Sequence, residues 1–90
     1  MKRKDRFELI KGYISINGPV DILNAEFVEY YIDSTDANFV AMKYGAFKCP
    51  QLGKDLADMR VYRMLTRARI GLPGLGQGFP KWVYSYRLAE

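Results

Sequence analysis

The chain has 90 residues, enough for one domain with a modest core. Hydrophobic residues make up 49% of the sequence and aromatic residues 14%, which excludes an intrinsically disordered chain. The net charge is +4, and a single cysteine with no histidine excludes an internal disulfide and a zinc site of the usual ligand types.

Charge is unevenly distributed along the sequence. Residues 1–12 carry five basic and two acidic side chains, residues 13–42 carry five acidic and no basic ones, and residues 43–90 carry nine basic against three acidic ones. A basic carboxyl-terminal half is the electrostatic footprint that nucleic-acid binding requires, although a merely solvated face gives the same pattern.

No apolar run is long enough to cross a bilayer, and the first residues lack the apolar stretch of a signal peptide. The lone cysteine fits a reducing compartment. We therefore expect a cytoplasmic protein that does not bind a membrane.

The first predicted element is a helix over residues 4–16. Phe7, Ile10 and Ile14 share one face at helical spacing, with charged residues interleaved. The dipeptide Asn-Gly that follows ends the helix, because both residues tolerate the left-handed conformation. A short, partly β-branched stretch then predicts an edge strand over residues 19–23.

A second helix is predicted over residues 25–33. Asn24 is a good N-cap, and apolar residues recur at helical spacing from Phe27 to Ile32. The other side of this helix is acidic, which argues against contact with phosphates. It is expected to face away from a nucleic acid or to receive a basic protein.

Residues 34–49 are predicted as a loop. Three apolar residues of this loop are expected to pack: Phe39, Val40 and Met42. Three residues around Gly45 are expected to point outward and to contact a phosphate backbone: Lys43, Tyr44 and Lys48.

A third helix is predicted over residues 50–65. Pro50 supplies the backbone angle that suits a first helical turn, and Leu52, Leu56 and Met59 share one face that requires a core. Four polar residues fall mostly on the opposite side, where they face a partner or water: Gln51, Lys54, Asp55 and Asp58.

Residues 66–88 are predicted to form a β-hairpin. The period changes to two after the third helix, so that Arg67 and Arg69 alternate with smaller or apolar residues. The return strand places three aromatic residues on one face, which is the expected core face. The tip from Gly71 to Pro80 is rich in glycine and proline and exposes three apolar residues: Leu72, Leu75 and Phe79.

Short apolar elements become stable only by sharing one core. The residues expected in it are Phe7, Ile10, Ile14, Phe27, Val28, Tyr31, Leu52, Leu56, Met59, Leu65, Ile70, Trp82 and Tyr84.

The predicted order of elements is helix, strand, helix, helix, strand, strand. A helix that leads into a basic hairpin with a glycine-rich tip resembles the third helix and wing of a winged helix-turn-helix domain, over nearly the whole chain. The resemblance implies an α+β fold, a winged helix of three helices with a small antiparallel sheet and a C-terminal β-hairpin wing, in a single domain over residues 1–90.

The resemblance also implies a function in double-stranded DNA binding, with the third helix in the major groove and the wing along the backbone or minor groove. Such a protein would act in transcriptional regulation or as an accessory protein of the phage or mobile-element type. The expected DNA-binding residues are Lys43, Tyr44, Lys48, Gln51, Lys54, Asp55, Asp58, Arg60, Arg63, Arg67, Arg69 and Lys81.

These residue types can form hydrogen bonds with DNA bases or phosphates. Glutamine can pair with adenine, lysine with guanine, and an aspartate can accept from the cytosine amino group. Arginine binds phosphate through a planar, charge-assisted fork. The alternative is that the helix face is merely solvated and that Arg60 and Arg63 pair with nearby carboxylates.

No enzyme activity, cofactor or metal is expected. Cys49 has no base partner, the acids form no recognisable pair, and the glycines of the hairpin tip precede no helix that could hold a nucleotide phosphate. The expected partners are DNA, a second copy of the chain, since palindromic sites are read by dimers, and a protein.

The alternative function is a winged-helix protein-interaction module. It would dock on a larger complex through the acidic second helix and the apolar wing tip. RNA binding through exposed tyrosines has less support, because the sequence contains no recognisable RNA-binding motif.

Overall fold

The computed structural model describes residues 1–42, 45–72 and 80–89 of the chain. These residues form a small α+β fold with three helices and two small antiparallel sheets. The elements in chain order are α1 (Arg3–Asn17), α2 (Ala25–Thr35), β1 (Val40–Ala41), β2 (Phe47–Lys48), α3 (Pro50–Val61), β3 (Leu65–Gly71) and β4 (Trp82–Leu88). None of the described helices combines the length and apolar character that crossing a membrane demands.

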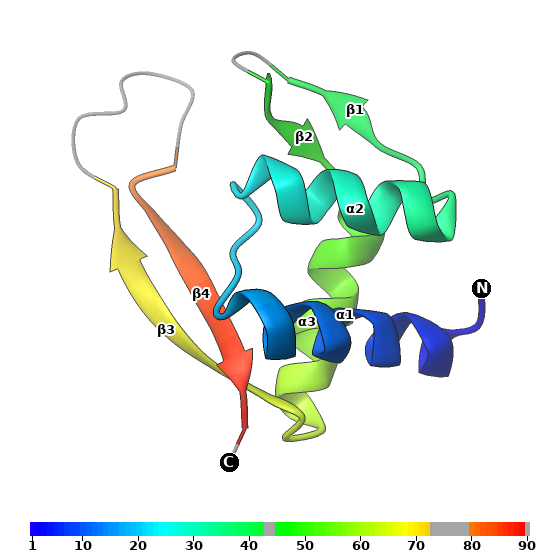
Figure 1. Cartoon of the computed structure of the whole chain (residues 1–90). Coiled ribbons are helices and arrows are strands. Elements are labelled where there is room, and N and C mark those ends of the chain that lie inside the picture. The colour runs from blue at the N-terminus through cyan, green and yellow to red at the C-terminus, as the bar shows by residue number, and fades with distance from the viewer. Residues whose placement is uncertain (43–44, 73–79, 90) are drawn as a thin grey trace.

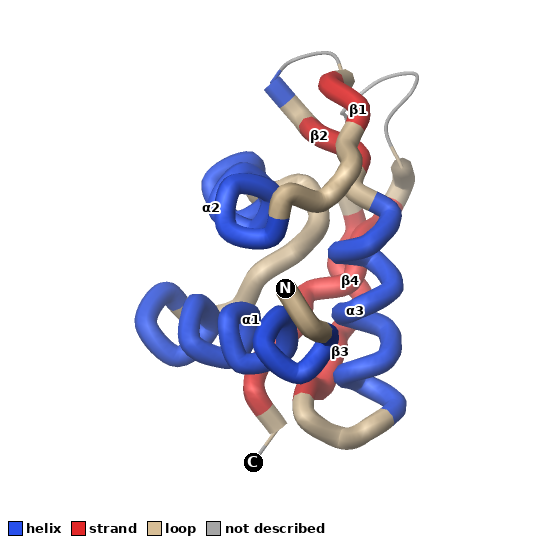
Figure 2. The backbone as a smooth tube through the Cα atoms, turned by 90° about the vertical axis from the view of Figure 1, so that its right-hand side faces the viewer, coloured by secondary structure: helices blue, strands red, loops and turns tan. Residues whose placement is uncertain are grey.

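The three helices form the body of the molecule. Helices α1 and α2 lie side by side, and α3 crosses behind them (Figure 1). The turned view shows α3 running upright on one side of both other helices (Figure 2). The β3–β4 hairpin follows α3 directly and runs back along one side of the helices (Figure 1). Helix α3 and this hairpin, both expected to bind DNA, are therefore continuous with each other.

Most of the predicted core is confirmed. Ten of the thirteen expected residues are buried, and the exceptions are Ile70, Trp82 and Tyr84. Val20, Ile32, Ala37 and Tyr86 complete the buried cluster. Ile70 is 43% exposed and Trp82 is 37% exposed because the hairpin extends beyond the helices that cover its base.

The helix ends follow local hydrogen-bonding rules. Asn24 caps α2 as predicted, accepting a hydrogen bond at 3.3 Å from the backbone N–H of Phe27. Helix α3 ends at Val61, four residues before the predicted end. Arg63 there adopts a left-handed φ of 63°, and the Met64 N–H donates to the Met59 carbonyl at 2.8 Å, which closes the helix.

The predicted strand over residues 19–23 is reduced to one bridge. Val20 and Tyr86 exchange two backbone hydrogen bonds, at 2.9 and 2.7 Å, and thus attach this segment to β4. The Asp21 side chain then accepts a hydrogen bond from the Leu23 N–H, which turns the chain and prevents a longer ladder.

The segment predicted as a loop contains the β1–β2 hairpin. Val40 pairs with Lys48 and Ala41 with Phe47. Three apolar residues expected to pack in this segment are largely exposed: Phe39, Val40 and Met42. Phe39 still contacts Phe47 edge to face, with ring centroids 5.6 Å apart, and Phe47 packs against the core.

The antiparallel pairing of β3 with β4 confirms the predicted hairpin and fixes its register. Arg67 lies opposite Tyr86, and Arg69 lies opposite Tyr84. Residues directly opposite each other point to the same face of an antiparallel pair. The arginines therefore lie on the same face as Trp82, Tyr84 and Tyr86. This face was expected to be the core face, but Tyr86 is the only one of the three aromatic residues that is buried.

Candidate nucleic-acid interface

The outer face of α3 carries only part of the expected contact set. Lys54 and Arg60 are exposed, whereas Gln51 and Asp58 are partly buried. Asp55 is only 2% exposed. The prediction that Asp55 faces a DNA groove is therefore wrong.

The position of Asp55 on the helix explains its burial. It follows Leu52 by three residues and precedes Met59 by four, so it lies on the same inward face as these two buried residues. A carboxylate at such a position requires partners from the rest of the chain.

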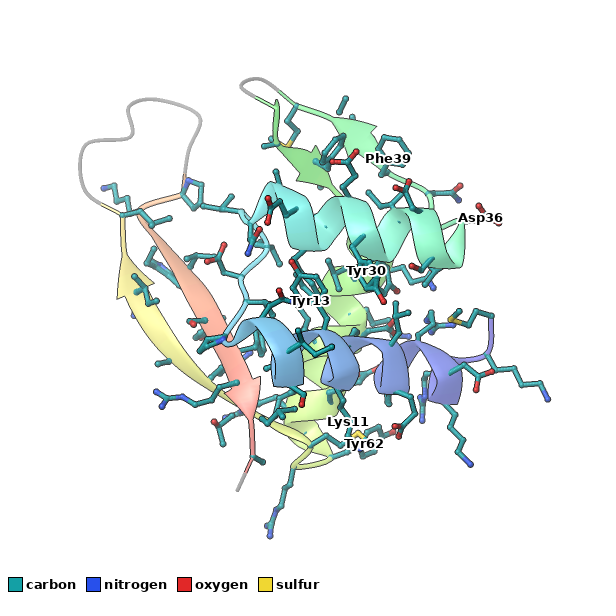
Figure 3. The ribbon with its side chains drawn as sticks, in the orientation of Figure 1. Lys11, Tyr13, Tyr30, Asp36, Phe39 and Tyr62 are labelled. Atoms are coloured by element: carbon teal, nitrogen blue, oxygen red, sulfur yellow. The ribbon has the colours of Figure 1, made fainter. Side chains whose placement is uncertain are left out.

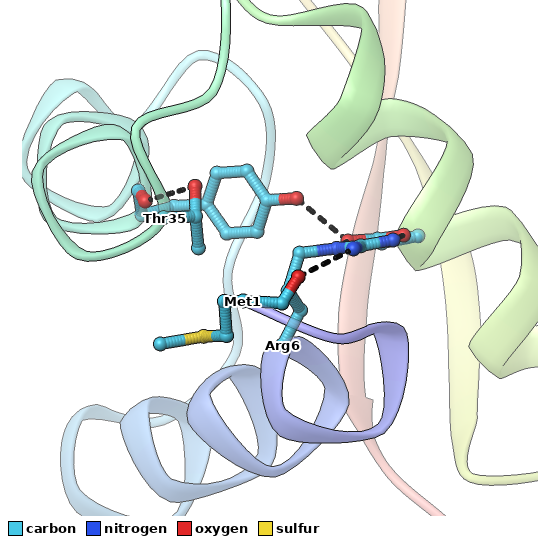
Figure 4. Close-up of polar contacts among 5 residues, drawn as sticks. Met1, Arg6 and Thr35 are labelled. Carbon is cyan, nitrogen blue, oxygen red and sulfur yellow. Dashed lines mark hydrogen bonds and ion pairs between the residues drawn. The ribbon is translucent and has the colours of Figure 1, made fainter.

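Asp55 is the centre of a buried polar network that joins the three helices (Figure 4). Arg6 of α1 donates two hydrogen bonds to this carboxylate, from Nε to Oδ2 at 2.8 Å and from Nη2 to Oδ1 at 3.1 Å. Tyr31 of α2 donates its hydroxyl to Oδ2 at 2.6 Å. Because both partners belong to other helices, the carboxylate holds α1 and α2 against α3 and acts as a structural group.

The network changes the proton affinity of its members. Burial raises the pKa of the Tyr31 hydroxyl above its usual range, and the hydrogen bond to Asp55 raises it further, since loss of the proton would place two negative charges side by side. The hydrogen bond to Asp55 raises the pKa of the Arg6 guanidinium as well. The folded chain therefore retains the Tyr31 proton in alkaline solution.

Stability is expected to fall above about pH 10 in a manner that depends on Tyr31. The pKa of Tyr31 is raised in the folded chain, so the unfolded chain loses this proton first. Unfolding then releases a proton, and the free energy of unfolding should drop by about 1.4 kcal/mol per pH unit until the folded-state pKa is reached. Urea unfolding measured between about pH 7 and pH 11 checks this slope.

The Tyr31→Phe variant isolates this contribution. It should be less stable than the wild type at neutral pH by roughly 1–2 kcal/mol, because Asp55 loses a buried hydrogen bond. It should also lack the alkaline slope, so that the two curves converge as pH rises. Tyr30→Phe, an exposed neighbour on the same helix, should keep the wild-type pH dependence. Parallel curves for the wild type and Tyr31→Phe would contradict this account.

A strip of cationic side chains runs from the end of α3 along the hairpin. The sequence has no acidic residue between Met59 and Ala89. The cationic strip consists of Arg60, Arg63, Arg67, Arg69 and Lys81. Arg87, opposite Thr66, points to the other face of the hairpin from Arg67 and Arg69. Within residues 1–42, 45–72 and 80–89, none of the five lies within 4.0 Å of a carboxylate oxygen. The alternative pairing of Arg60 and Arg63 with nearby acids is therefore not found in this part of the chain.

Arg63 occupies a backbone position that favours glycine. Its φ of 63° lies in the left-handed region, where a side chain costs about 1 kcal/mol. The side chain of Arg63 is exposed, so the core does not require it. The left-handed turn that closes α3 therefore carries an exposed cation at the junction of α3 and the hairpin.

Two arginines of the strip rest on aromatic rings of β4. The Arg67 Cζ lies 3.9 Å from the centroid of the Tyr84 ring, and the Arg69 Cζ lies 4.3 Å from that of Trp82. The sequence shows that arginines alternate with other residues in β3 and that aromatic residues alternate with other residues in β4, but the stacking of the arginines on the rings was not predicted from it. Which arginine meets which ring depends on the register of the two strands, and the register depends on the turn that connects them.

The other expected contacts lie around the two hairpins. Lys48 is exposed on β2, just before α3. Leu72 is partly buried, contrary to the expected exposure, and its N–H donates to the Lys81 carbonyl at 2.8 Å. Four residues assigned roles by the sequence lie outside the described residues: Lys43, Tyr44, Leu75 and Phe79.

Comparisons of the chain with protein-family models, with curated proteins and with solved structures gave no match. The function is therefore inferred from the charge and geometry of the site, because a fold alone does not define a function.

Proposed function

We propose that the chain binds double-stranded DNA as a winged-helix protein, with α3 toward the major groove and the β3–β4 hairpin as the wing, in transcriptional regulation. The cationic strip is the observation that carries this proposal. Its side chains extend from the last turn of α3 to the far part of the hairpin, and no acid of the same segment opposes them. A surface of this kind attracts phosphates and releases their counterions.

The attachment of Val20 to Tyr86 supports the same proposal. It adds a third backbone segment beside β4, so the hairpin is anchored at its base on both the α3 side and the α1 side. An anchored hairpin holds its arginines in fixed positions relative to α3. Fixed positions lower the entropy lost when charged side chains meet a phosphate backbone.

Salt-dependent binding to duplex DNA tests the proposal. Fluorescence anisotropy of a labelled duplex of mixed sequence should show binding that weakens steeply with salt, with a log–log slope of about −0.9 for each phosphate contacted. No binding at low salt, or affinity independent of salt, would overturn the proposal.

A pair of charge reversals tests the orientation of α3. Lys54→Glu and Lys2→Glu change the net charge equally, but Lys54 is exposed on α3, whereas Lys2 precedes α1, at the end of that helix farther from β4. Lys54→Glu should weaken duplex binding about tenfold more than Lys2→Glu, since it replaces a phosphate-binding cation by a charge that repels phosphate. Equal effects would show that α3 does not face the duplex.

The acidic surface of α2 favours a second candidate function, docking on a protein. Glu26, Glu29 and Asp33 are exposed on α2. Phe39, at the start of the β1–β2 hairpin and on the same side of the molecule as Asp36 (Figure 3), is 47% exposed. An exposed aromatic side chain with a polar rim is typical of a protein interface. Absence of duplex binding at low salt, with co-purification of a partner that Glu29→Lys releases, would favour this candidate.

A further inference from the structure

A groove of about 740 Å³ runs along β4 on the aromatic face of the hairpin. Its apolar walls include Trp82, Tyr84, Tyr86 and Ile22, and its polar edge includes Arg69 and Lys81. The groove is within the size range of small-ligand sites, and its walls are mostly apolar with a few charged groups. This combination suits a ligand with a flat apolar part and a negative charge.

The rings of the groove form an ordered stack with Arg69, which lines the groove, and with the neighbouring Arg67. The Trp82 and Tyr84 rings lie 4.8 Å apart, edge to face, and the Tyr84 and Tyr86 rings lie 6.3 Å apart. Arg67 lies over Tyr84 and Arg69 over Trp82. Each guanidinium is thus held in place by a ring, and it needs little further ordering to receive a phosphate or a planar base.

The aromatic wall of the groove is open to solvent. Trp82 is 37% exposed, because this part of the hairpin extends beyond the helices, and Ile22 is 44% exposed. Bases of unpaired nucleotides stack on such aromatic walls, and their phosphates pair with adjacent cations. The absence of acidic residues between Met59 and Ala89, with Arg69 and Lys81 at the edge of the groove, favours this anionic occupant over a basic peptide partner.

We propose that this groove binds an unpaired nucleotide of single-stranded DNA, with the base against Trp82 and Tyr84 and the phosphates at Arg69 and Lys81. The proposal extends the proposed function, since it shares the cationic strip with duplex binding but assigns a separate role to the aromatic wall. Duplex contacts require only the cations, whereas an unpaired base requires the rings.

Trp82 reports directly on the groove, because it is the only tryptophan of the chain. A short oligothymidine should quench Trp82 fluorescence saturably, because a base stacks on the indole. An abasic oligomer of equal length and charge should bind about 10- to 100-fold more weakly, since only stacking distinguishes the two. Equal affinity for the two oligomers would overturn the proposal.

Variants separate stacking from folding. In anisotropy measurements with labelled oligothymidine, Trp82→Leu should weaken binding about tenfold and Trp82→Phe should retain most of it. Tyr62→Leu, which removes an exposed ring outside the groove, should have no effect. Thermal unfolding of each variant shows whether the fold is retained. Wild-type affinity in Trp82→Leu would overturn the proposal.

Duplex binding measured in parallel distinguishes the two proposals. If the duplex binds with the expected salt slope and oligothymidine leaves Trp82 unquenched, the groove proposal fails and the proposed function stands. If oligothymidine binds in the groove and the duplex does not bind, the proposed function fails and the groove proposal stands. Quenching by a proline-rich peptide, with oligothymidine inert, would assign the groove to a protein partner and overturn the proposal.

Discussion

Replacing Asp55 with alanine is expected to lower the free energy of unfolding by roughly 3–5 kcal/mol. The substitution leaves the Arg6 guanidinium and the Tyr31 hydroxyl without the acceptor that both use. Tyr31 is fully buried and the side chain of Arg6 is only 17% exposed, so water replaces the missing acceptor poorly. Urea or guanidinium unfolding followed by circular dichroism measures the change.

Asp58→Ala is the matched control, because it removes the same group one turn further along α3. The Asp58 side chain is partly exposed, and it takes no part in the network around Asp55. Its removal should change stability by no more than about 0.5 kcal/mol. A destabilisation of Asp55→Ala below about 1 kcal/mol would refute the structural role of this carboxylate.

A double variant tests whether the destabilisation of Asp55→Ala arises from leaving the Arg6 guanidinium without its carboxylate. Arg6→Met with Asp55→Leu replaces the ion pair by apolar side chains of similar size, which is often nearly neutral in a protein interior, and leaves only the Tyr31 hydroxyl without its acceptor. This variant should therefore be more stable than Asp55→Ala, although it carries two substitutions. If it is less stable, the ion pair itself contributes stability, beyond the penalty for breaking it.

Helical periodicity predicted most of the core but could not identify the role of Asp55. The spacing of Leu52, Leu56 and Met59 gives the buried face of α3, and Asp55 falls geometrically within that face. A charged residue is assigned to solvent by its type, however, because burial requires partners. Those partners, Arg6 and Tyr31, lie 49 and 24 residues away in sequence, and only the packed fold brings them together.

The candidate interface was predictable in composition but not in geometry. The change to a period of two after α3 predicts the strands, and the acid-free stretch predicts their charge. Which residues share a face depends on the pairing of Arg67 with Tyr86, which strand patterns alone leave open. The bridge at Val20 is likewise a long-range pairing, and local hydrogen bonding at Asp21 shortened the strand that residue types predicted.

Removing three cations of the strip is expected to weaken duplex binding by roughly 10²-fold near 0.15 M salt and to flatten the log–log salt slope by about 2.7. The variant combines Arg60→Gln, Arg63→Gly and Lys81→Gln, all at exposed positions. Arg63→Gly also relieves the left-handed backbone of that residue, so stability should be kept or slightly raised. Loss of binding with unchanged or higher stability could not be explained by unfolding.

The control for this variant replaces Lys2, Lys4 and Lys11 with glutamine and lowers the net charge by the same amount. These residues lie at or before α1, and the ion pair that the control removes, Lys11 with Glu8 at 3.4 Å, is exposed and contributes little. The control should retain nearly the wild-type salt slope. If both triple variants lose affinity equally, binding follows the total charge of the chain and the strip is not a defined interface.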